Sequence, residues 1–74
     1  LMKGLSMKYN AKQFGINVRE VRKNRDISQD QLALRAGIDR SYMGRIERGQ
    51  VNITLEKVYR LAEALDCSIY DLMP

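Results

Sequence analysis

Two short stretches of this chain, joined through a glycine, constrain its fold more than any other feature. The first begins at Ser28, which starts a capping box with a glutamine three residues later, and it ends at Gly37. The second begins at Asp39, a typical N-cap residue, and ends at Gly49. Apolar residues recur at helical spacing in both. The sequence therefore predicts two short helices separated by a turn of three or four residues.

The rest of the chain also predicts helices. The single proline is Pro74, and alternating runs of β-branched residues are absent. We expect a first helix from about Tyr9 to Asn24, a fourth from a cap at Thr54, and a short fifth from a cap at Ser68. The apolar stripe expected on the fourth comprises Leu55, Val58, Leu61, Ala62 and Leu65. The fold class is an all-α, five-helix domain over residues 9–74, preceded by a disordered or vector-derived segment, residues 1–8.

Composition excludes several classes of function. The 74 residues include no histidine and a single cysteine, Cys67, so neither an intramolecular disulfide nor a usual zinc site can form. We expect no metal, no cofactor and no enzyme, because the groups of general acid–base and nucleophilic catalysis are missing. No apolar run approaches the roughly 18 residues of a membrane span, and no signal peptide is evident. A cytoplasmic protein is expected, and its net charge of +4 favours polyanionic partners.

The two short helices have the spacing of a DNA-binding helix-turn-helix. Met43 and Ile46 would anchor the second of them, at about residues 39–48, and leave its other face free. That outward strip contains Arg40, Ser41, Gly44, Arg45 and Arg48, with Tyr42 at its edge. Arginine is the commonest reader of guanine in the major groove, and hydroxyl groups can hold phosphate. Gly44 either allows close approach to DNA or clears a neighbouring helix, and Tyr42 either contacts DNA or packs beside the first of the two helices.

Several motifs resemble one known family. They are Ile27-Ser28-Gln29-Asp30-Gln31-Leu32-Ala33, Ala36-Gly37-Ile38, Arg45-Ile46-Glu47-Arg48-Gly49, Thr54-Leu55-Glu56 and Leu61-Ala62-Glu63-Ala64-Leu65. Together they are similar to the phage repressor and Cro family, also called XRE-type regulators, over roughly residues 16–73. The resemblance implies a five-helix, lambda-repressor-like domain that binds double-stranded operator DNA as a symmetric dimer and regulates transcription, commonly as a repressor.

The resemblance also implies roles for individual residues. It assigns base contacts to Arg40, Ser41, Gly44 and Arg45, although glycine offers no side chain for one. Phosphate contacts are expected from Gln29, Tyr42, Arg48 and Asn52. Asp26 stands where the family often has glycine, in a left-handed conformation. The family further suggests that Arg22, a charge on the inner stripe of the first helix, pairs with Glu47.

We expect two copies to associate through the end of the chain. The candidate interface residues are Leu65, Ile69, Tyr70 and Leu72. A symmetric dimer would place its two recognition helices in successive major grooves, with half-sites about 10 base pairs apart. Within the family, Asp39-Arg40-Ser41-Tyr42 and Asn52-Ile53-Thr54-Leu55 resemble the controller proteins of restriction–modification systems.

Three alternatives stay open at this point. A helical adaptor or an antitoxin subunit would keep the fold without binding an operator, although outward arginines argue against an adaptor. RNA fits less well, because the major groove of A-form RNA is deep and narrow. The basic cluster of Arg19, Arg22, Lys23 and Arg25 is more often a solvated face than a binding site.

Overall fold

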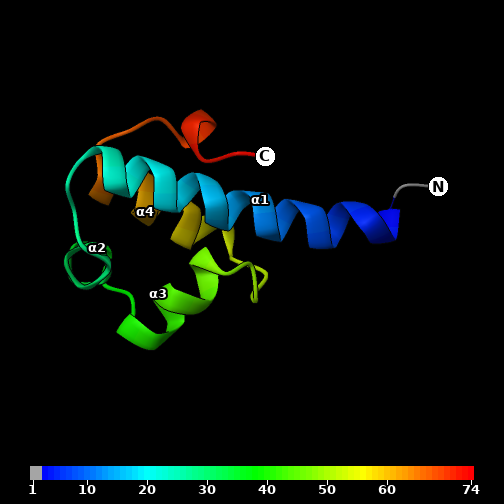
Figure 1. Ribbon diagram of the computed structural model, residues 1–74, viewed down its shortest axis with the longest axis horizontal. Helices are drawn as coiled ribbons and strands as arrows, with labels where there is room; N and C mark the ends of the chain where they lie inside the picture. The colour runs from blue at the N-terminus through cyan, green and yellow to red at the C-terminus, as the bar shows by residue number, and fades with distance from the viewer. Residues whose placement is uncertain (1–2) are drawn as a thin grey trace.

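Capping residues set the boundaries of the helices in the computed structural model, which describes residues 3–74, with side chains from Tyr9 onward. Over these residues the chain forms four α-helices and one turn of 3-10 helix (Figure 1). They are α1 (Lys3–Asn24), α2 (Gln29–Ala36), α3 (Arg40–Glu47), α4 (Leu55–Leu65) and η1 (Ile69–Asp71). The all-α class and the helix-turn-helix are confirmed.

The predicted caps of α2 and α3 are present. The hydroxyl of Ser28 accepts a hydrogen bond from the backbone N–H of Gln31 at 3.0 Å, and the Gln31 side chain accepts one from the N–H of Ser28 at 2.8 Å. Gly37 ends α2 with φ 66°, in the left-handed region where a Cβ costs energy. Asp39 caps α3 by accepting from the N–H of Tyr42 at 3.2 Å. These local signals therefore place the two helices as the sequence predicts.

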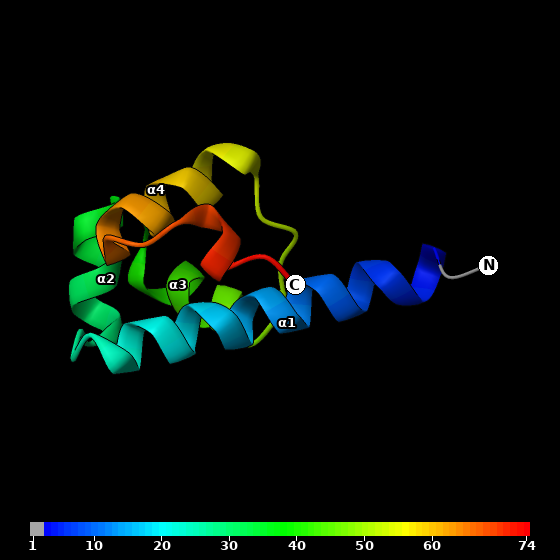
Figure 2. The same ribbon diagram turned by 90° about the horizontal axis from the view of Figure 1, so that it is seen from above.

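α1 is longer than the sequence predicts. It begins at Lys3 instead of near Tyr9, because residues 3–8 contain no proline and one glycine, so nothing interrupts the helix. α1 thus includes residues 3–8 of the expected tail, whereas residues 1 and 2 lie outside the described residues. The first half of α1 extends beyond the other helices and gives the molecule its 38 Å long axis (Figures 1 and 2).

The expected fifth helix is the single turn η1. Ser68 caps it as predicted, but the turn contains three residues before the chain reaches the buried Leu72. There the side-chain amide of Asn17, on α1, donates hydrogen bonds to the carbonyl oxygens of Leu72 and Met73 at 3.1 and 3.0 Å. These bonds hold the end of the chain against α1, just after η1 ends at Asp71.

The core lies where the helices meet. α1 packs against α3 and α4, and α2 packs against the same two helices. The largest fully buried side chains are Val18, Leu32, Met43, Ile46, Leu61, Leu65 and Leu72. Leu55 departs from the predicted stripe of α4: it is 68% exposed, because it is the first residue of α4 and stands at the edge of the buried face. Within the described residues, no helix has the length and apolar character needed to cross a membrane.

Candidate DNA-binding surface

The inner side of α3 is fixed to the body by close packing. Met43 and Ile46 are 0% and 1% exposed and belong to the core. Gly15 on α1 lets the two helices approach, since a Cβ at that position would lie 2.6 Å from the carbonyl oxygen of Glu47. Sequence reasoning missed this role, although a glycine inside a helical pattern is a recognised signal of close backbone approach.

An ion pair between α1 and α3 completes this anchor. The guanidinium of Arg22 donates to the Glu47 carboxylate from Nε at 2.7 Å and from Nη2 at 3.0 Å. Its remaining Nη1 donates to the carbonyl oxygen of Ile27 at 3.0 Å. The two side chains are 11% and 4% exposed. The structure therefore contains the pair suggested by the family resemblance, and the pair ties α3 to the turn before α2.

Gln29 joins this network instead of pointing freely outward. Its side-chain amide donates to Oε1 of Glu47 at 3.1 Å. A primary amide carries two hydrogens, so one donor is left for a phosphate. The position at the start of α2 is thus the predicted one, and Glu47 fixes the orientation of the amide.

The outer side of α3 is cationic and polar. Ser41, Arg45 and Arg48 are exposed, as the sequence predicts. Arg40 is also exposed, but its guanidinium forms an ion pair with Asp30 of α2, a partner that sequence reasoning did not identify. Among the described side chains, Arg45 and Arg48 have no carboxylate partner. Two arginines are therefore available for a polyanion without breaking an internal ion pair.

Gly44 is a gap in this outer side. It is buried beneath neighbouring side chains, and a Cβ there would lie 3.1 Å from Nη1 of Arg48 and 3.7 Å from both Nη1 of Arg40 and Oε1 of Gln29. The atoms nearest to this position are the ends of polar side chains and not the backbone of a neighbouring helix, so helix clearance does not explain Gly44. Close helix packing requires Gly15 instead.

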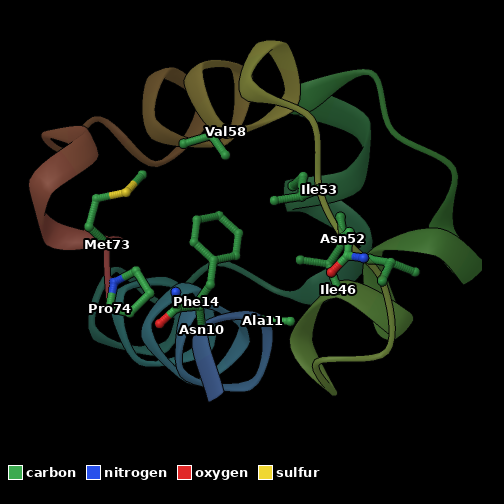
Figure 3. Close-up of a pocket in the computed structure, with 10 residues that line it drawn as sticks. Asn10, Ala11, Phe14, Ile46, Asn52, Ile53, Val58, Met73 and Pro74 are labelled. Carbon is green, nitrogen blue, oxygen red and sulfur yellow. The ribbon is translucent and has the colours of Figure 1, made fainter. Parts of the chain in front are cut away.

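Tyr42 and Asn52 occupy the flanks of the strip. The Tyr42 ring is half-buried and carries Nζ of Lys57, from α4, 4.6 Å above its centre. Its ring is thus held beside α4 by packing and by a cation–π contact. Asn52 lies exposed in the loop between α3 and α4, beside an apolar hollow of about 370 Å³ into which Phe14 points (Figure 3).

Two of the four predicted interface residues lie inside the protomer. Leu65 and Leu72 are 0% exposed and form part of the core, so they are wrong as interface residues. Helical periodicity marks them as apolar and does not distinguish a core from an interface. Ile69 is half-buried and Tyr70 is 81% exposed. The large apolar side chains that remain exposed on α4 and the segment after it are Leu55, Tyr59, Tyr70 and Met73.

This fold and surface define a class of protein. A short helix is anchored on one side, is cationic on the other and follows a glycine turn, which is the arrangement of a lambda-repressor-like helix-turn-helix domain. The sequence matches the HTH_3 helix-turn-helix family over residues 18–72. The chain belongs to this family of transcription regulators, which implies DNA binding and not enzymatic activity.

The chain is similar to several controller proteins. It is 42% identical over 57 residues to the control protein C.SmaI of Serratia marcescens, which covers 77% of this chain and 68% of that protein. It is 34% identical over 61 residues to the control protein C.BamHI of Bacillus amyloliquefaciens, covering 81% and 75%. The crystal structure of the restriction-modification controller protein C.AhdI from Aeromonas hydrophila superposes with a TM-score of 0.83 and 43% identity, covering 85% of this chain and 96% of that one.

Proposed function

We propose that this protein binds specific sequences of double-stranded DNA through α3 and thereby regulates transcription. The observation that carries the proposal is the division of α3 into two sides. Its inner side is buried against α1 and the core, and its outer side exposes arginine and serine without a covering segment among the described residues. A helix held in this way can enter the major groove as a rigid unit.

The residues of the outer side divide into two roles. Arg45 and Ser41 are the proposed base readers, with Arg40 beside them once its guanidinium is shared between Asp30 and DNA. Gly44 stays among the base-facing positions through its backbone alone. Gln29, Arg48, Tyr42 and Asn52 are proposed to contact phosphates on either side of the groove. Phosphate contacts fix register, and base contacts carry the sequence preference.

Two copies are proposed to bind together through the α4 and η1 side of the molecule. Leu55 and Tyr59 share a face of α4, four residues apart, and Tyr70 lies on η1, which packs against α4. A small domain that exposes several large apolar side chains on two elements in contact has reason to bury them against a second copy. Two α3 helices related by twofold symmetry would read half-sites about 10 base pairs apart.

Similarity to three restriction–modification controller proteins supports a regulatory role of the same kind. Such a role requires nothing beyond a DNA-binding domain that associates with itself. We propose that the chain controls transcription of neighbouring genes by occupying a site near their promoter.

Selection of bound sequences from a random pool of duplex DNA tests the proposal directly. The expected result is a palindromic consensus with the half-site spacing given above. Enrichment of a single half-site would contradict the dimer while supporting specific binding. Retention of no duplex at low ionic strength would overturn DNA binding and favour the adaptor or antitoxin alternative.

A further inference from the structure

A recess of about 320 Å³ opens beside α3, on the side that faces α1. We call it the Gly44 recess, and it is lined by Arg19, Arg22, Gln29, Gly44, Glu47 and Arg48. Three elements that are separate in sequence therefore contribute to it: α1, the start of α2, and α3 with its C-cap residue. Gly44 makes room for it, because any larger side chain at that position would project toward Arg48 and Gln29, which line the recess.

The charge of the Gly44 recess is positive. Its single carboxylate, Glu47, is balanced by the guanidinium of Arg22, which donates two hydrogen bonds to it, and it accepts a third from the neutral amide of Gln29. Arg19 and Arg48 are exposed, and neither forms an ion pair with any described side chain. Two guanidinium groups thus face one cavity with no anion of the protein to balance them. Such an arrangement suits an oxyanion, since guanidinium groups bind phosphate oxygens in pairs.

We propose that the Gly44 recess holds one phosphate group of the DNA backbone, with Arg19 and Arg48 on either side of it. This inference rests on the proposed function and extends it to α1, where the sequence favoured a solvated basic face. The free amide hydrogen of Gln29 supplies a third donor. The recess positions α3 along the strand that borders the major groove, and it makes no base contact of its own.

Binding to sonicated random-sequence duplex DNA, measured over a range of salt concentrations, tests the recess apart from sequence recognition. The logarithm of the binding constant falls linearly with the logarithm of salt concentration, by about 0.9 per phosphate contact. Arg19→Ala is expected to make this slope shallower by about that amount. Arg35→Ala removes the same charge from an exposed position outside the recess, and it should leave the slope unchanged.

The two sources of failure are distinguishable. If the unchanged protein retains no duplex DNA at low salt, the proposed function is wrong and the recess fails with it. If the unchanged protein binds, and Arg19→Ala has the same slope as Arg35→Ala, the recess alone is overturned.

A second pair of variants separates the effect of adding a negative charge at position 44 from the effect of filling the recess. Gly44→Gln and Gly44→Glu introduce side chains of the same length, and circular dichroism shows whether both stay folded. Gly44→Glu would pair with the arginines inside the recess, so we expect weaker binding and a shallower slope than for Gly44→Gln. If both folded variants keep the slope of the unchanged protein, a phosphate site in the recess is contradicted.

Discussion

Arg22 and Glu47 are joined by two hydrogen bonds, from Nε at 2.7 Å and from Nη2 at 3.0 Å, across the contact between α1 and α3. Because both side chains are almost fully buried, removing one partner leaves the other charge without compensation. We expect Arg22→Ala or Glu47→Ala to lower the free energy of unfolding by about 3–5 kcal/mol. Urea denaturation followed by circular dichroism measures this.

A double variant separates the cost of an unpaired charge from the value of the pair itself. Arg22→Met combined with Glu47→Leu removes both charges and fills the space with apolar side chains. It should be more stable than either alanine variant, since a buried pair is often replaceable by apolar residues. An alanine variant that melts like the parent would show that the charges are solvated in the protein.

Gly15 allows a second test of the contact between α1 and α3, through the stability of the fold. A Cβ at this position would lie 2.6 Å from the carbonyl oxygen of Glu47, a backbone atom that cannot move without shifting α3. Gly15→Ala should therefore destabilise the fold by about 1–3 kcal/mol, despite the better helix propensity of alanine. Gly44→Ala is the matched control, because its Cβ meets only the flexible ends of side chains. Thermal unfolding of both variants measures the difference in their stability. An equal rise in Tm for the two variants would contradict the close approach of α1 and α3.

The contrast between these two glycines shows what could be read from the sequence. Caps and turn residues act within a few residues of themselves, so Ser28, Gly37 and Asp39 could be assigned correctly. Asp26, with φ 55°, takes the left-handed conformation that the resemblance implies. Gly15 could not be assigned, because its role depends on direct contact with Ile46 and Glu47 of α3, which lie far from it in sequence.

The candidate surface was predictable to a similar extent. The outward side of α3 follows from helical periodicity once Met43 and Ile46 are taken as buried. The ion pair between Arg40 and Asp30, and the convergence of Arg19 with Arg48, depend on how three helices cross, which periodicity does not specify. Periodicity likewise could not show that Leu65 and Leu72 of the predicted interface lie in the core.

Arg45 distinguishes base reading from phosphate binding. If it reads a base, Arg45→Ala should weaken binding to the selected operator by about 1–3 kcal/mol and relax the preference at one base pair. Binding to random duplex DNA should change much less. Titrations with both DNAs at one salt concentration provide the measurement. Equal losses on the two DNAs would instead assign Arg45 to the backbone.

The thiol of Cys67, just after α4, predicts a dependence of reactivity and stability on pH. Burial raises the pKa of its thiol, the negative charge of Asp71 raises it further, Arg25 lowers it and Asp66 raises it. The thiolate fraction at neutral pH is therefore below that of a free cysteine. Alkylation by iodoacetamide should be slow at neutral pH in the folded protein and should rise at a higher pH than in urea-unfolded protein.

The same shift of the Cys67 pKa links stability to alkaline pH. The folded state keeps its thiol proton to a higher pH than the unfolded state, so the contribution to stability is complete below the pKa of the unfolded thiol. It is then lost as pH rises through the pKa of the folded thiol. Cys67→Ala should remove this part of the pH dependence. A thiol that reacts at the same pH before and after unfolding would contradict the shift.

Substitutions at Tyr70 and at Leu72, two residues apart, should have different effects: one on self-association and the other on folding. Tyr70 is 81% exposed, whereas Leu72 is 0% exposed. Leu72→Ala should lower the free energy of unfolding by about 2–5 kcal/mol, because it leaves a cavity in the core. Tyr70→Ala should leave unfolding nearly unchanged and weaken the dimer by more than about 1 kcal/mol, which is several-fold in its dissociation constant. Sedimentation equilibrium measures the association, and Leu34→Ala, an equally exposed apolar residue on α2, is the control. If Tyr70→Ala and Leu34→Ala associate alike, the two copies do not meet through η1.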